Sequence, residues 1–160
     1  HPTYPPKSEE KDWFVPRSFM DFPLETTRTI SNMVYTGMLE RCPDIRFIMS
    51  HAGGAMPFLA RRLELFDPLS PYKENFPKGT MHYLKRLYYD TALSNSPEQL
   101  AALQALAEPE HILFGTDFPY VPEGPVTAEC TRFDGYDGFN EATRRMVERD
   151  NALPLFPRFA

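Results

Sequence analysis

The chain alternates short apolar segments of strand length with longer segments whose apolar residues recur at helical spacing. Strands that are joined through helices run parallel, because a parallel pair needs a long crossover connection. The alternation therefore predicts an α/β protein built on a parallel sheet. The expected strands are residues 45–50, 87–92 and 111–115, and the expected helices are residues 21–42, 55–66, 80–86, 96–106 and 139–151.

Prolines separate these segments. The chain has 17 prolines in 160 residues, about twice the usual share of roughly 5%. Proline has no backbone N–H and a fixed φ, so it disfavours helix interiors and central strands. The prolines predict loops over residues 1–20, 67–79 and 116–138.

Two further prolines fit the starts of helices instead. Asp21 can cap a helix that has Pro23 in its first turn, where a backbone N–H has no helical partner in any case. Ser96 is followed by Pro97 and then by Gln99, which is the spacing of a capping box. Both sites therefore predict a helix start.

The composition indicates one folded domain that binds neither membrane nor nucleic acid. No apolar run approaches the roughly 18 residues that a membrane-spanning helix needs. The net charge is −5 and the basic residues cluster only in pairs, which argues against a nucleic-acid surface. Cys42 and Cys130 are too few for a disulfide framework, so we expect reduced thiols in a cytoplasmic protein.

Polar side chains follow the expected strands where each strand ends. His51 comes directly after the first, Asp90 lies at the end of the second, and Asp117 comes just after the third. The carboxyl ends of parallel strands open on one side, where ligands bind. An imidazole and a carboxylate that converge there are typical of a metal site or of acid–base catalysis.

Each of these residues also has a purely structural interpretation. A histidine after a strand often only hydrogen-bonds its own loop, Asp117 could cap a turn, and His1 could be an exposed terminal residue. The Gly53–Gly54 pair beside His51 favours a functional role, because glycine lets the backbone approach a ligand closely.

Other candidates are weaker. No dinucleotide-binding glycine motif, phosphate-binding loop or G-x-S-x-G nucleophile motif occurs in the chain. His82, on a helical face, and His111, at the start of a strand, are expected to be structural. Several loop aromatic residues could line a binding site or simply pack in the core, namely Trp13, Phe14, Phe118 and Tyr120.

Three stretches taken together resemble the C-terminal half of the amidohydrolase-related superfamily. They are residues 47–58 (FIMSHAGGAMPF), 88–92 (YYDTA) and 112–120 (ILFGTDFPY). The H-x-G-G and G-T-D-x-P motifs occur in the order of that family, with a strand between them. More narrowly, the chain resembles the branch of aminocarboxymuconate-semialdehyde, γ-resorcylate and 6-methylsalicylate decarboxylases.

This resemblance implies the C-terminal part of a metal-dependent TIM (β/α)8 barrel that binds one divalent ion, zinc or manganese. By resemblance, His1 and Asp117 match metal ligands at the ends of the fifth and eighth strands. His51 matches a histidine beside the metal that acts as acid or base, together with Asp117. Arg62 matches an arginine that reaches the substrate of a neighbouring subunit, which implies a homo-oligomer. The implied reaction is non-oxidative decarboxylation of an aromatic or enoic carboxylic acid, a small-molecule substrate.

Part of the family pattern is missing from the sequence. It contains neither His-x-His nor Glu-x-His, the first-strand ligand pair of the family, and a closed barrel needs about 250 residues. Residues 1–160 are therefore interpreted as one partial domain without its N-terminal strands, opening at His1 with no initiating methionine. We expect this fragment alone to bind metal poorly and to be inactive. The alternatives are a lactonase or amidase on the same scaffold, and a truncated product without catalytic activity.

Overall fold

Three parallel strands form the centre of the structure, a computed structural model that describes residues 14–159. The strands lie side by side in the order β1 (Ile48–Met49), β2 (Tyr88–Asp90) and β3 (Ile112–Leu113). Both neighbouring pairs are parallel, and helices connect the strands along the chain. The predicted parallel α/β architecture is confirmed, although each strand is shorter than its apolar segment.

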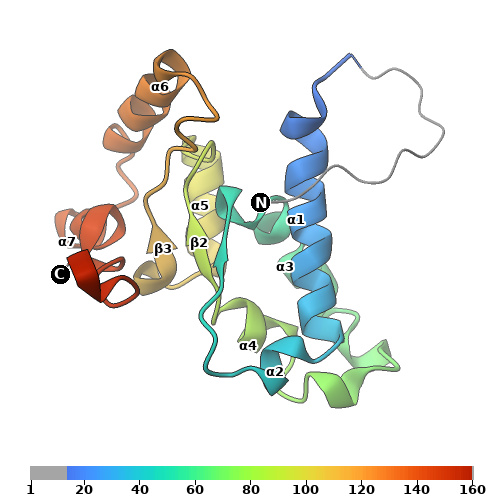
Figure 1. Ribbon diagram of the computed structural model, residues 1–160. Coiled ribbons are helices and arrows are strands. Elements are labelled where there is room, and N and C mark those ends of the chain that lie inside the picture. The colour runs from blue at the N-terminus through green and yellow to red at the C-terminus, as the bar shows by residue number, and fades with distance from the viewer. Residues whose placement is uncertain (1–13, 160) are drawn as a thin grey trace.

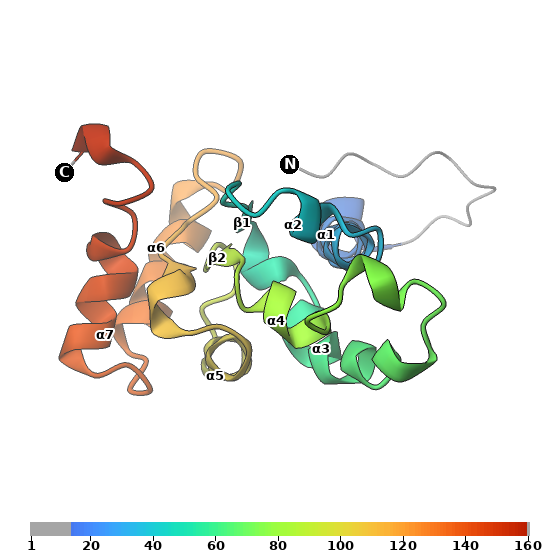
Figure 2. The ribbon, with the colours of Figure 1, turned by 90° about the horizontal axis from the view of Figure 1, so that it is seen from below.

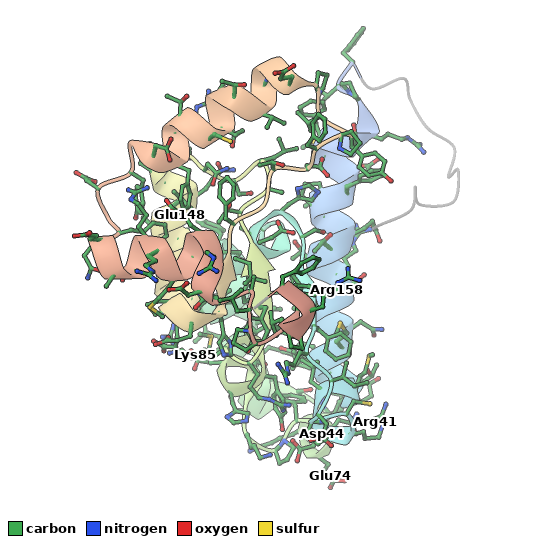
Figure 3. The ribbon with its side chains drawn as sticks, turned by 60° about the vertical axis from the view of Figure 1, so that its left-hand side comes forward. Arg41, Asp44, Glu74, Lys85, Glu148 and Arg158 are labelled. Atoms are coloured by element: carbon green, nitrogen blue, oxygen red, sulfur yellow. The ribbon has the colours of Figure 1, made fainter. Side chains whose placement is uncertain are left out.

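The α-helices of the described residues are α1 (Arg17–Tyr35), α2 (Met38–Arg41), α3 (Met56–Glu64), α4 (Thr80–Leu84), α5 (Pro97–Leu106), α6 (Glu123–Asp134) and α7 (Glu141–Arg145). α1 runs along one side of the sheet, and α6 and α7 lie on the other side (Figure 1). α3, α4 and α5 lie together on one face of the strands (Figure 2). Charged side chains such as Arg41, Lys85 and Glu148 point outward (Figure 3). Within residues 14–159, no helix combines the length and the apolar character needed to cross a membrane.

Tyr89 lies at the centre of the core. It is fully buried in the middle strand, where it pairs with Met49 of β1 and Ile112 of β3. Its hydroxyl donates a 2.8 Å hydrogen bond to the carbonyl oxygen of Leu84, so the buried polar atom is satisfied. Burial raises the pKa of Tyr89 well above its ordinary value, and the phenol therefore stays neutral.

The first helix differs from its predicted bounds. α1 begins at Arg17, directly after Pro16, and not at Asp21. It ends before Gly37, which adopts a left-handed φ of 73° and starts the separate helix α2. A Cβ at Gly37 would lie 2.8 Å from the carbonyl oxygen of Asn75, so the helix breaks where this loop approaches.

The loop predicted over residues 116–138 was wrong in its second half, which forms α6. The prolines of this segment favoured a loop in the prediction, whereas in the structure they lie at the start of the helix. Pro122 precedes α6, and Pro125 lies in its first turn, where the missing N–H costs no helical hydrogen bond. The predicted capping box of α5 is confirmed: Ser96 accepts from the Gln99 backbone, and the Gln99 side chain accepts from the Ser96 backbone.

The C-terminal helix is attached to β3. Asn140 caps α7, and the chain continues from Arg145 in a wider π-helical turn over Met146–Asp150. The side-chain amide of Asn151 then donates 2.9 Å and 2.8 Å hydrogen bonds to the carbonyl oxygens of Ile112 and Pro109. The predicted helix over residues 139–151 is therefore present, with a change of pitch in its second half.

Candidate functional site

The carboxyl ends of the three strands open onto one cavity of about 770 Å³. His51 follows β1 by two residues and Asp117 follows β3 by four, and both line the cavity. The structure thus brings the predicted imidazole and carboxylate to one space. The remaining lining residues are Ser18, Phe19, Phe22, Pro23, Gly54, Leu93, Ser94, Gln99, Tyr120, Val121, Pro122, Pro125, Ala128, Glu129 and Arg132.

His51 is held through both its backbone and its ring. The residue is buried, with 8% of its surface exposed. The backbone N–H donates to Asp90 Oδ1 at 2.9 Å, and ring Nδ1 lies 3.1 Å from the carbonyl oxygen of Ala92. A carbonyl oxygen only accepts, so Nδ1 carries the proton of this hydrogen bond. In the neutral ring Nε2 is then the basic nitrogen, which is the tautomer that a proton acceptor needs.

The backbone at the strand ends is strained. His51, Ala52, Leu93 and Asp117 have φ values of 55°, 54°, 53° and 63°, in the left-handed region. This conformation costs a residue other than glycine about 1–2 kcal/mol. Strain of this kind persists where the surrounding structure enforces it, and it concentrates at functional sites. Both candidate residues of the sequence, His51 and Asp117, are among the four.

The pKa of Asp90 is influenced by both candidate residues, His51 and Asp117. Burial raises the pKa of Asp90, while the backbone N–H groups of His51 and Ala92 and the charge of His51 act to lower it. The carboxylate of Asp117 raises it further. Sequence reasoning placed Asp90 at a strand end but assigned it no role. That position was the one available signal.

The paired glycines pack against α1 and the core. Gly53 and Gly54 have φ values of 74° and 68°. A Cβ at Gly54 would lie 2.1 Å from the carbonyl oxygen of Pro23, and one at Gly53 would lie 2.8 Å from the Tyr89 ring. These close approaches to α1 and to the core seat the loop of His51, and Gly54 also lines the cavity.

The structure does not place the other two residues implied by resemblance at the cavity, one of them because it is not described. His1 falls outside the described residues. Arg62 is exposed on α3 and does not line the cavity. His111 hydrogen-bonds the Leu87 carbonyl oxygen through Nδ1 and stacks on Tyr88, which fits the structural role expected for it.

The aromatic wall of the cavity comes mainly from a helix. Phe19 and Phe22 of α1 line the cavity, although neither was predicted to do so. Of the predicted loop aromatics, Tyr120 lines it. Phe14 and Phe118 do not and are largely exposed. Trp13 falls outside the described residues. Phe19 was missed because the loop was expected to extend to residue 20.

The described residues hold only part of a metal site. Among residues 14–159, no three His, Cys, Asp or Glu side chains lie close enough together to bind one ion. The carboxylate of Asp117 and the imidazole of His51 are suitable donors for a divalent ion. A complete ligand set would need donors beyond this part of the chain.

Comparison with known proteins identifies relatives of the chain. The 6-methylsalicylic acid decarboxylase of Penicillium expansum is 35% identical over 159 residues, which are 99% of this chain and 49% of that protein. The chain thus spans about half the length of this relative.

Solved structures show the same fold. A crystal structure of an amidohydrolase II protein is 27% identical, with a TM-score of 0.85, and the match covers 97% of this chain and 49% of that one. The dihydroxybenzoic acid decarboxylase of a Polaromonas species, with bound manganese, is 20% identical with a TM-score of 0.73 over 86% of this chain and 41% of that one. The amidohydrolase family model matches residues 9–158, and the chain therefore belongs to the amidohydrolase family.

Proposed function

We propose that this chain is part of a metal-dependent, non-oxidative decarboxylase that acts on an aromatic or enoic carboxylic acid. The observation that carries the proposal is the meeting of His51 and Asp117 at one cavity, in a chain 35% identical to a 6-methylsalicylic acid decarboxylase. The cavity offers Phe19, Phe22 and Tyr120 as apolar walls for a planar ring.

His51 is proposed as the residue that moves the proton. Its Nδ1 is committed to the Ala92 carbonyl oxygen, so Nε2 is the nitrogen that exchanges a proton with the substrate. Protonated at Nε2, His51 delivers the proton to the ring carbon that bears the carboxylate. The bond between that carbon and the carboxylate then breaks, its electron pair returns to the ring, and CO2 leaves. His51 regains the proton from solvent.

Asp117 is proposed as a metal ligand, with His1 as a second and the remaining donors from residues beyond those described. A bound divalent ion would orient the oxygen atoms of the substrate and withdraw negative charge from them as a Lewis acid. The bound manganese of the Polaromonas enzyme supports a divalent ion in this family. Asp90 accepts hydrogen bonds from His51 and Ala92 and so joins the loop of His51 to the loop after β2.

Arg62 is proposed to act in a second subunit. It is exposed on α3, and within residues 14–159 it forms no ion pair, whereas its neighbour Arg61 pairs with Glu64. Its exposed position on α3 leaves its guanidinium accessible to a neighbouring molecule. This supports a homo-oligomer in which Arg62 serves the neighbouring site.

The test uses the complete protein that contains this chain. Purified enzyme is incubated with 6-methylsalicylate, and CO2 release is measured. His51→Gln keeps a polar side chain but cannot shuttle a proton, and we expect it to lower kcat by about 100-fold or more. Far-UV circular dichroism should remain that of the wild type. Retained turnover in this variant would remove His51 from the mechanism, and hydrolysis of a lactone without CO2 release would contradict the decarboxylase proposal.

A further inference from the structure

One face of α6 forms a wall of the cavity. Pro125, Ala128, Glu129 and Arg132 line it at spacings of three and four residues, which places them on one side of the helix. The first two are small or apolar, and the last two are charged. The sequence predicted a loop over these residues, so it did not predict that charged side chains would lie on one helical face at the cavity.

Glu129 fixes the position of Arg132. Glu129 is buried, and its Oε2 accepts from the backbone N–H of Asn95 at 3.3 Å and from the Asn95 side-chain amide at 3.4 Å. Its Oε1 accepts from Nη1 of Arg132. Asn95 is fully buried and directly follows Ser94, which lines the cavity. The guanidinium is thereby tied to the loop after β2, and not only to its own helix.

Arg132 has hydrogen-bond donors left for a ligand. A guanidinium carries five N–H groups in a planar fork, and the bond to Glu129 uses one of them. Within the described residues the structure shows no other acceptor for this side chain, which is 59% exposed. The fork matches the two oxygens of a carboxylate.

The charges of the cavity also favour this role. Among the described lining residues, Asp117 and Glu129 are acidic, and Arg132 is the one residue with a permanent positive charge. Arg132 is thus the cationic side chain of this lining with which an anionic substrate can form an ion pair. Arg62 does not line the cavity of its own chain.

We propose that Arg132 binds the carboxylate of the substrate within its own chain and selects acids over their neutral decarboxylated products. This inference rests on the proposed function. The carboxylate keeps its charge until the bond to the ring breaks, so an ion pair with Arg132 stabilises the bound acid and the transition state to a similar degree. Loss of Arg132 should therefore raise KM and leave kcat nearly unchanged.

The experiment compares Arg132→Gln with Arg145→Gln in the complete enzyme. Arg145 is an exposed arginine of α7 that pairs with Asp150 and does not line the cavity, which makes it a matched control. Binding of 6-methylsalicylate and of its decarboxylated product 3-methylphenol is measured by calorimetry, and KM and kcat are measured by CO2 release. The calorimetric titrations are done in the His51→Gln background, in which turnover does not consume the acid.

Arg132→Gln should weaken binding of the acid by about 10- to 100-fold, the range of a charge-assisted hydrogen bond. Binding of the phenol should change by less than about twofold, and Arg145→Gln should leave both affinities as in the wild type. Arg132→Lys, which keeps the charge without the fork, should recover part of the lost affinity. A KM increase without a kcat decrease would accompany these changes.

Two outcomes would overturn the inference. Equal weakening of acid and phenol in Arg132→Gln would show that the residue only supports the shape of the cavity. Unchanged affinity for the acid, or no binding of the acid to the wild type, would remove Arg132 from recognition. Binding of the acid without CO2 release would contradict the proposed function alone.

Discussion

Two backbone N–H groups converge on one carboxylate oxygen at the centre of the site. His51 and Ala92 both donate to Asp90 Oδ1, at 2.9 Å and 3.0 Å, and the His51 ring bonds the Ala92 carbonyl oxygen. These contacts join the loops after β1 and β2. The left-handed backbone of His51 therefore depends on an acceptor at position 90, and a neutral acceptor of the same shape should suffice.

Asp90→Ala should destabilise the protein and misplace His51. Two partly buried N–H groups lose their acceptor, at a cost of about 1–3 kcal/mol each. We expect the free energy of unfolding to fall by about 2–4 kcal/mol, measured as a lower urea midpoint, with a loss of decarboxylase activity. Asp90→Asn is the control, because its amide oxygen can accept both bonds. Equal free energies of unfolding for Asp90→Ala and Asp90→Asn would show that the hydrogen bonds to Oδ1 do not stabilise the folded protein.

The pH dependence of stability separates the charge of Asp90 from its hydrogen bonds. Its pKa is raised mainly by burial, so the folded state favours the protonated carboxyl more than the unfolded state does. Its contribution to stability is therefore fully present below the ordinary pKa of 3.8 and decreases as pH rises through the folded pKa. The difference between the urea midpoint of Asp90→Asn and that of the wild type should therefore increase as the pH rises from 3.8 through the folded pKa of Asp90. A difference that is independent of pH would contradict the raised pKa.

The sequence supported His51 and Asp117 as candidates because the carboxyl ends of parallel strands lie at the same edge of a sheet. Residues that directly follow two such strands therefore come close together. The same logic could not assign a role to Asp90, whose partners are backbone groups on two loops. The sequence pattern also did not predict that Glu129 and Arg132 line the cavity. Their place in the cavity depends on where α6 lies, and that is set by contacts with Asn95 in a different loop.

At the scale of elements, helix starts that carry a local capping signal were predictable. α5 has such a signal in Ser96 and Gln99. α6 has prolines before and within its first turn and no side-chain cap, so its start resembles a loop. The end of α1 is likewise set by a distant segment, the loop of Asn75 that packs against Gly37. A contact with a distant segment thus accounts for the end of α1, whereas α6 was missed because its start carries no local capping signal.

The seating of the β1 loop on α1 can be tested with two glycines. Gly54→Ala places a Cβ 2.1 Å from the Pro23 carbonyl oxygen at a φ of 68°, so both strain and overlap oppose it. We expect a loss of about 2–4 kcal/mol in the free energy of unfolding. Gly124→Ala in α6 meets no atom within 4 Å and should be neutral, or stabilising by up to about 1 kcal/mol. Equal unfolding midpoints for the two variants would contradict the close packing at Gly54.

At the scale of the whole molecule, the sheet of the described residues has two outer strands. β1 and β3 each pair with β2 alone in this part of the chain. Ile48 of β1 is 40% exposed and the nearby Ile45 is 52% exposed. The Penicillium relative is about twice as long as this chain. We therefore expect the further strands of a family barrel to cover this edge and to complete the ligand set around Asp117.

The isolated 160-residue chain should consequently behave differently from the complete protein. Its unpaired strand edges and exposed apolar residues favour self-association, and its described residues supply too few ligands to hold an ion. We expect aggregates or oligomers in light scattering, and no divalent metal above background in elemental analysis after dialysis. The complete protein should retain metal in proportion to its chains, and Asp117→Ala should remove most of it. A monomeric 160-residue chain that keeps a stoichiometric ion would show that residues 1–160 hold a complete site, because no other donors would then be present.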